Sequence, residues 1–140
     1  MRRGPFHHID LNVSDIAAAR RVYGVVLEFL GYRCVKDTAE GCEWDLDSGD
    51  HAGASLGIKR CDPAQAHHGH NRYAPGLHHL AWRAESRAAV DELHALLVAQ
   101  EIRVLDPPAF YPQYSGDYYA VFFEDADGIK LEVVHAPGWI

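Results

Sequence analysis

This sequence has no long apolar run. Its apolar stretches fall far short of the roughly 20 residues that a membrane-spanning helix needs. The opening residues, "MRRGPFHHID", contain no apolar segment like that of a signal peptide. We therefore expect a protein without a membrane segment, located in the cytoplasm.

Positive charge and cysteine are also scarce. The chain has 13 Lys and Arg against 20 Asp and Glu, a formal net charge of −7, and no basic stripe. Such a surface repels nucleic acid and anionic membranes, so we expect neither as a partner. The three cysteines, Cys34, Cys42 and Cys61, show no C-x-x-C spacing, which argues against a disulfide framework and a thiolate zinc site.

The composition is typical of one compact domain. Of the 140 residues, 48% are hydrophobic and 24% are charged, which is enough apolar material for a hydrophobic core. The length is short for two independent domains, so we expect a single one.

An internal repeat is the most informative feature that is present. The stretch "FHHIDLNVSDIAAARRV" begins at Phe6 and resembles "LHHLAWRAESRAAVDEL", which begins at Leu77. Each has an apolar residue, two histidines, an alternating segment, a polar turn and a helical segment. The offset is 79 minus 8, or 71 residues, about half of the 140-residue chain. Two copies of one supersecondary unit are indicated.

Periodicity predicts the same order of elements in both copies. In the first copy, Ser14 or Asp15 offers a helix N-cap and Gly31 ends the helix. The expected ranges are a strand at 6–13, a helix at 15–30 and strands at 32–38, 41–48 and 52–60, then a strand at 77–84, a helix at 86–100 and strands at 102–108, 117–125 and 129–135.

The fold class that follows is α+β, with two βαβββ modules forming a curved mixed sheet around a cavity; the residues described below make this a candidate metal-binding cavity. We expect one domain, with module 1 at about residues 5–61, a linker loop at about 62–76 and module 2 at about 77–136. The helices would cover one side of the sheet and leave the other side free.

The histidines of the repeat are candidates for chemistry. Strand alternation places His8 on the face opposite Ile9 and Leu11. In the second copy His79 takes the place of His8 and shares its face with Arg83. The two imidazoles are therefore expected to point into a shared concavity.

The last strand adds a carboxylate. In "DGIKLEVVH", Leu131 and Val133 face the helix, so Lys130 and Glu132 face the cavity. A carboxylate in an otherwise apolar strand is costly unless a cation holds it. His8, His79 and Glu132 would make a two-histidine, one-carboxylate set, which leaves coordination positions open for catalysis. Fe, Mn, Zn, Ni and Co all suit these donors, and the sequence does not choose among them.

A plainer interpretation stays open for each of these residues. Core hydrogen bonds satisfy most strand histidines, and a nearby Lys or Arg can pair with Glu132. The metal interpretation is favoured because independent core histidines have no reason to fall at matching places in both halves.

Other polar residues are weaker candidates. By alternation His7 and His78 point to the opposite face, so a structural role is expected. The alternative is a bulge at the strand edge that exchanges the roles of the two histidines in each pair. Tyr119, Arg83 and Lys130 are candidates for catalysis, the last two as anion contacts or simply as members of ion pairs. Three linker histidines are favoured to lie in a solvated loop: His67, His68 and His70. Three tyrosines near the second hairpin are favoured to have a packing role: Tyr111, Tyr114 and Tyr118.

The motifs "HHIDLNVSD", "GLHHLAWRAES" and "FFEDADGIKLEVVH" occur in this order and spacing. In these three motifs and their order, the sequence resembles the vicinal oxygen chelate superfamily, also called the glyoxalase, bleomycin-resistance and extradiol-dioxygenase family. The resemblance implies a homodimer of paired βαβββ modules and a divalent metal held by His8, His79 and Glu132. It also implies a small-molecule substrate whose two neighbouring oxygens bind the metal, with Lewis-acid catalysis of lyase or isomerase, oxygenase or thiol-transferase type.

One departure narrows this expectation. Pairing "GASLGI" with "GIKLEV" aligns Gly57 with Glu132, so glycine stands where glyoxalase I enzymes carry a fourth ligand. Lactoylglutathione lyase activity is therefore not expected. The alternatives are an antibiotic-binding sequestration protein without catalysis and a metal site that persists after loss of activity. Walls of a binding groove would then come from aromatic residues: Trp44, Tyr73, Phe110 and Tyr111.

Overall fold

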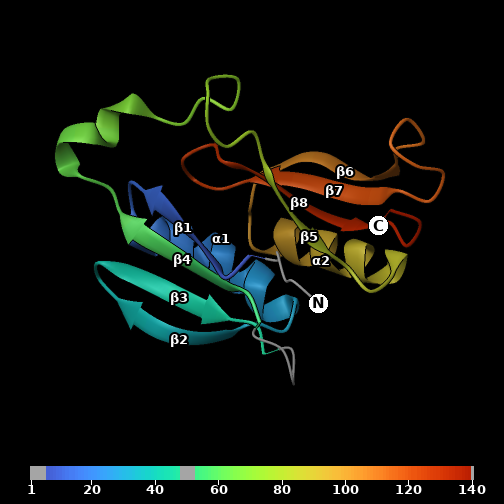
Figure 1. The fold of residues 1–140 in the computed structure, drawn as a ribbon, viewed down its shortest axis with the longest axis horizontal. Helices are drawn as coiled ribbons and strands as arrows, with labels where there is room; N and C mark the ends of the chain where they lie inside the picture. The colour runs from blue at the N-terminus through green and yellow to red at the C-terminus, as the bar shows by residue number, and fades with distance from the viewer. Residues whose placement is uncertain (1–5, 48–52, 140) are drawn as a thin grey trace. The chain divides into compact units, whose positions relative to one another are not determined.

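The computed structural model describes residues 6–47 and 53–139. They form two compact units that divide between His68 and Gly69, called unit 1 and unit 2 (Figure 1). Each unit has one α-helix and a four-stranded mixed sheet in the order strand, helix, three strands. The α+β class and the repeated order of elements are thereby confirmed.

Unit 1 contains the first copy of the repeat. Its elements are β1 (His8–Val13), α1 (Ile16–Phe29), β2 (Arg33–Thr38), β3 (Gly41–Asp45) and β4 (Ser55–Arg60), followed by the 3-10 helix η1 (Pro63–His68) in the expected linker. The strand order is β1-β4-β3-β2, with β1 parallel to β4 and the other pairs antiparallel. The expected boundaries at residues 5, 48 and 52 lie outside the described residues.

Unit 2 repeats this topology. Its elements are β5 (Leu80–Arg83), α2 (Arg87–Ala99), β6 (Val104–Phe110), β7 (Tyr119–Glu124) and β8 (Lys130–His135). The strand order is β5-β8-β7-β6, again with one parallel pair, β5 with β8. Two strands that are far apart in the sequence therefore lie side by side in each unit: β1 with β4 and β5 with β8. His8 and Glu132 lie on these strands, and His79 directly precedes β5.

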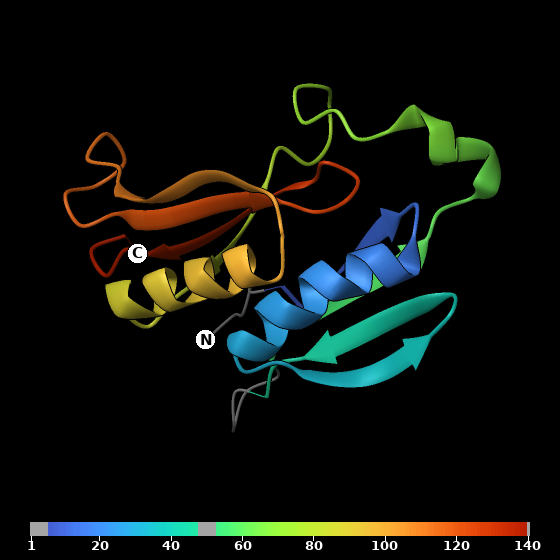
Figure 2. The ribbon, with the colours of Figure 1, turned by 180° about the vertical axis from the view of Figure 1, so that it is seen from behind.

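Both helices begin at a side-chain cap and cover one face of their own sheet (Figure 2). Asp15 accepts a hydrogen bond from the Ala18 N–H at 3.0 Å, and Ser86 accepts one from the Ala89 N–H at 3.0 Å. Gly31, with φ of +90°, follows α1 and supplies the left-handed turn that ends it. The apolar stripes of the helices pack on the sheets, which leaves the opposite face of each sheet for polar side chains.

β5 and β6 differ most from the expected ranges. β5 begins at Leu80, so His79 precedes the strand instead of lying within it. β6 runs to Phe110, and its pairing with β7 is irregular between Val104 and Ala109. Pro107 and Pro108 lie in this irregular stretch and have no N–H to donate, which an edge strand tolerates.

Within residues 6–47 and 53–139, no helix is both long and apolar enough to span a lipid bilayer.

Candidate functional site

Glu132 is the centre of the polar face of unit 2. It lies in the middle of β8 and is 1% exposed, between the fully buried Leu131 and Val133. Its neighbours across the sheet are Ala81 on β5 and Phe122 on β7. A carboxylate buried to this degree is costly unless other groups neutralise or hydrogen-bond it, so its contacts determine what the site can do.

Two side chains contact the Glu132 carboxylate. The Tyr118 hydroxyl donates a hydrogen bond to Oε1, and His79 Nε2 lies 3.0 Å from Oε2. Burial, reinforced by the hydrogen bond to Glu132, raises the pKa of Tyr118 far above its usual value of 10. The hydroxyl therefore stays protonated and acts as a donor to the carboxylate.

A cavity of about 250 Å³ opens beside this carboxylate. Its lining combines the polar groups with aromatic and small apolar side chains: His79, Ala81, Trp82, Arg83, Tyr118, Glu132, Val134, Ala136 and Trp139. The rings of Tyr118 and Trp139 meet edge to face, with centroids 5.7 Å apart. Such a mixture of apolar walls and a few polar groups is typical of small-molecule sites.

The C-terminal turn is tied to the segment that carries Tyr118. The Gly138 N–H donates to Asp117 Oδ2 at 2.8 Å, and Ser115 Oγ donates to Asp117 Oδ1 at 2.9 Å. These two hydrogen bonds hold the pKa of Asp117 below its usual value. The result is that Trp139 is kept against the Tyr118 ring at the cavity wall.

The three catalytic candidates lie in different places. Arg83 lines the cavity. Lys130 Nζ lies 4.5 Å from the centroid of the Phe122 ring, on the polar face of the sheet. The Tyr119 hydroxyl instead donates to Asp91 Oδ1 on α2 at 2.7 Å, so the structure does not bring it to Glu132.

Tyr118, one residue earlier, is the tyrosine at the carboxylate. Phe122 is opposite Glu132 in the β7–β8 register, and alternation puts residues 118, 120 and 122 on its face. Tyr119 consequently faces the helix. The signal was present in "YYAVFFED", where counting in steps of two from Phe122 identifies Tyr118.

His8 occupies the corresponding place in unit 1. It begins β1, and its Nε2 is 4.0 Å from Asp10 Oδ2, which in turn is 3.1 Å from Lys59 Nζ. Asp10 is paired with Gly57 as Ala81 is paired with Glu132 in unit 2. A β-carbon on Gly57 would collide with Asp10 Oδ1, so this glycine makes room for the Asp10 carboxylate.

The first histidine of each pair is not where alternation predicts. His7 and His78 lie in bends before the strands, and each contacts its neighbour through Nδ1, at 3.0 Å to His8 and 2.8 Å to His79. The expectation that they point to the opposite face was wrong because a bend has no strand periodicity. Desolvation, and then the charges of His79, Lys130 and Arg72, lower the pKa of His78.

The predicted ligands are only partly gathered. Across residues 6–47 and 53–139, no three His, Cys, Asp or Glu side chains lie close enough together to hold a metal ion. His79 and Glu132 do lie together in unit 2, whereas His8 belongs to unit 1. The three-residue ligand set therefore stays a prediction.

The pair formed by His79 and Glu132 fits a divalent cation chemically. An imidazole nitrogen and a carboxylate oxygen are donors that divalent transition metals accept. Nε2 of His79 and Oε2 of Glu132 are 3.0 Å apart beside the cavity. In the metal-free protein the same distance suits a hydrogen bond from Nε2–H to the carboxylate.

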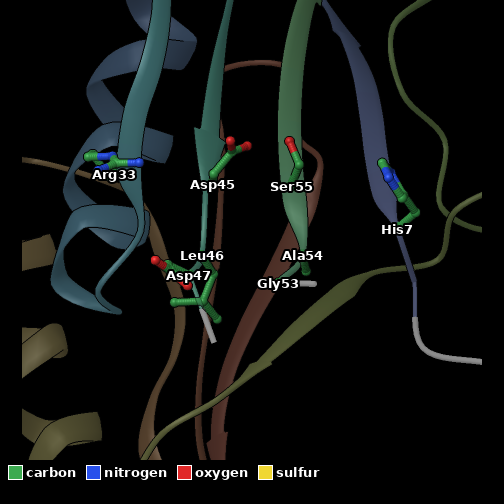
Figure 3. A pocket seen from close by; sticks show the side chains of 8 residues that line it. All are labelled: His7, Arg33, Asp45, Leu46, Asp47, Gly53, Ala54 and Ser55. Atoms are coloured by element: carbon green, nitrogen blue, oxygen red, sulfur yellow. The ribbon is translucent and has the colours of Figure 1, made fainter. Parts of the chain in front are cut away.

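A second cavity, of about 300 Å³, lies in unit 1 (Figure 3). Its lining runs across the sheet, from Arg33 at the start of β2 through Asp45 on β3 and Ser55 on β4 to His7 just before β1. It contains His7 but not His8, and its charges are mixed. Trp44, expected as a wall of a ligand groove, is 1% exposed and belongs to the core of this unit.

Comparison with known proteins gives consistent matches. A family model described as Glyoxalase/Bleomycin resistance protein/Dioxygenase superfamily matches residues 6–133. The chain is 39% identical over 129 residues to the uncharacterized protein YqjT of Bacillus subtilis (strain 168), covering 91% of this chain and 96% of that protein.

Solved structures share the fold over almost the whole chain. A candidate glyoxalase from Bacillus halodurans has a TM-score of 0.79 at 27% identity, covering 96% of this chain and 97% of that one. A lactoylglutathione lyase from Agrobacterium tumefaciens has a TM-score of 0.67 at 20% identity, covering 99% and 98%. The second likeness concerns the fold alone.

Proposed function

The chain belongs to the Glyoxalase/Bleomycin resistance protein/Dioxygenase superfamily, and we propose that it is a divalent-metal-dependent enzyme acting on a small molecule with two neighbouring oxygen atoms. The observation that carries this proposal is the buried Glu132 carboxylate, which faces His79 at 3.0 Å beside a cavity of about 250 Å³. A buried carboxylate and an imidazole that meet at a cavity are well suited to a catalytic cation.

The proposed ligands are His8, His79 and Glu132. Support for the last two is their contact within unit 2. Support for His8 is the internal repeat, in which it takes the place of His79 at the start of the equivalent strand pair. The ion is Fe, Mn, Zn, Ni or Co, and when bound it supplies Lewis acidity that stabilises negative charge on a substrate oxygen.

The other residues of the cavity have separate roles. Tyr118 holds Oε1 of Glu132 and so leaves Oε2 directed at His79. Trp139 and Val134 offer apolar walls for the carbon part of a substrate. Arg83 lines the same cavity and is placed to contact an anionic substrate oxygen.

We propose a reaction other than that of lactoylglutathione lyase. Gly57 occupies in unit 1 the register position that Glu132 occupies in unit 2, so it cannot supply a fourth protein ligand. A three-ligand set leaves more coordination positions for substrate and fits oxygenase or thiol-transferase chemistry as well as lyase or isomerase chemistry.

Isothermal titration calorimetry of the metal-free protein with Zn²⁺ tests the proposal. His79→Ala and Glu132→Gln should each weaken binding by at least about 100-fold, since each removes a directly bound donor. His94→Ala is the matched control, because this histidine lies on α2, away from the polar face; its affinity should equal that of the wild type. Unchanged affinity in His79→Ala would refute the assignment.

A non-catalytic binding protein is the competing outcome. It would bind its ligand equally well after treatment with a chelator, whereas a metal-dependent enzyme would not. We also propose that the chain forms a homodimer, as is common in this superfamily, and light scattering of the purified protein tests this directly.

A further inference from the structure

The same contact between neighbouring histidines occurs in both units. In unit 1, Nδ1 of His7 is 3.0 Å from Nδ1 of His8, and the rings are nearly perpendicular, at 85°. In unit 2, Nδ1 of His78 is 2.8 Å from Nδ1 of His79, at 76°. Because each unit forms this contact from its own residues, the arrangement arises twice.

The contact has a definite chemistry. Between two neutral imidazoles, a hydrogen bond that joins the two Nδ1 atoms needs one of them to carry a proton and the other to accept it. A ring that donates through Nδ1 has a free lone pair on Nε2, the form required to bind a cation. Holding Nδ1 therefore determines what Nε2 can do.

The second histidine of each pair directs Nε2 toward a carboxylate. His79 Nε2 is 3.0 Å from Glu132 Oε2, and His8 Nε2 is 4.0 Å from Asp10 Oδ2. Each of these rings is thus held at one nitrogen and presents the other toward the polar face of its sheet. The group that holds Nδ1 of a ligand histidine is usually a carboxylate or a backbone carbonyl; here another histidine stands in that place.

We propose that His7 and His78 are positioning residues, each of which holds Nδ1 of the histidine that follows it so that Nε2 is the metal-binding nitrogen. The inference rests on the proposed metal-dependent function. It explains why the chain repeats a pair of histidines, where one from each pair would suffice as ligand.

A histidine is suited to this task because it can both donate and accept. With neutral imidazoles, a His79 ring that donates through Nε2–H to Glu132 accepts a hydrogen bond at Nδ1 from His78 Nδ1–H. A His79 ring with Nε2 free for a cation would instead carry its proton on Nδ1 and donate to His78 Nδ1, and the His78 ring would then carry its proton on Nε2. Each ring holds one proton in both states. A carboxylate could serve only one of these states.

Zn²⁺ affinity of His78 variants is the first arm of the test. His78→Ala should weaken binding by about 10- to 100-fold, as loss of such a supporting group usually does. His78→Asn should recover most of the affinity, because its amide can accept or donate near the position of Nδ1. His67→Ala is the matched control, since His67 also packs against a neighbouring histidine, at 4.4 Å between centroids, but in η1; it should bind as the wild type does.

Nitrogen-15 NMR of the imidazoles is the second arm, and it needs no activity. His79 should carry its proton on Nε2 in the metal-free protein and on Nδ1 with Zn²⁺ bound, and His78 should show the reverse. A purely structural His78 would leave the tautomer of His79 unchanged in His78→Ala.

Different results would contradict the proposed metal-dependent function and the proposed positioning role of His78. A wild-type protein that binds no Zn²⁺ contradicts the proposed function and with it the ligand roles. A protein that binds Zn²⁺ with equal affinity in the wild type and in His78→Ala, with no change in the His79 nitrogen signals, overturns the positioning role alone.

Discussion

At the scale of single residues, Glu132 shows how a sheet accommodates a buried charge. Its flanking residues are fully buried, and its carboxylate is held by a hydroxyl on one oxygen and an imidazole on the other. The carboxylate is retained in an otherwise apolar strand because partners from two other segments of unit 2 contact both of its oxygens.

Removal of the hydroxyl should have a measurable effect. Tyr118→Phe leaves Oε1 of a buried carboxylate without its donor, which should lower the free energy of unfolding of the metal-free protein by about 1 to 3 kcal/mol. Tyr119→Phe is the matched control: it breaks the same kind of hydrogen bond, to Asp91 at 2.7 Å, at a more exposed site, and should cost less than about 0.5 kcal/mol. Urea unfolding measures both, and equal losses would contradict the special role of Tyr118.

Side-chain alternation explains which site residues could be identified from the sequence. Glu132 was assigned to the polar face because Leu131 and Val133 had to face the helix, and the structure places it there. Tyr119, not Tyr118, is the catalytic candidate that the sequence suggests, whereas the structure brings Tyr118 to Glu132. The choice between the two depends on a one-residue register that the β7–β8 pairing fixes. His78 was misplaced because it lies before the strand, where alternation does not apply.

At the scale of elements, local signals were sufficient for the helices. The expected helix at 15–30 corresponds to α1 (Ile16–Phe29), because an Asp cap, an apolar stripe and a following glycine agree with one another. β6 was less predictable. Its two prolines interrupt the hydrogen-bond ladder, so its extent depends on the neighbouring β7 rather than on its own sequence.

The hydrogen bonds that the Asp117 carboxylate accepts from Ser115 and from the C-terminal turn lead to a prediction about the pKa of Asp117. Ser115 and the Gly138 N–H donate to the Asp117 carboxylate and hold its pKa below the usual value of 3.8. The stabilisation is present above that value and is lost as pH falls through the lower pKa of the folded state. Carbon-detected NMR should give a midpoint below 3.8 that rises in Ser115→Ala. An unchanged midpoint in that variant would show that the serine does not contribute.

At the scale of the whole molecule, the two units are variations on one plan. In both, a pair of histidines lies at or just before the start of the first strand of the parallel pair. The partner strand carries Glu132 in unit 2 and Gly57 in unit 1. The repeat, which was visible in the sequence, was sufficient to predict this plan. Gly57 is the basis on which we propose a reaction other than that of lactoylglutathione lyase.

The central claim is the proposal that the chain binds one divalent ion with His8, His79 and Glu132 as its ligands. Metal content per chain, measured by elemental mass spectrometry on wild-type protein and on His8→Ala after equal loading with Zn²⁺ and removal of excess, tests it most directly. The account predicts close to one ion per chain in the wild type and close to none in His8→Ala, although the substitution leaves the His79 and Glu132 pair intact. Retention of one ion per chain by His8→Ala would contradict it.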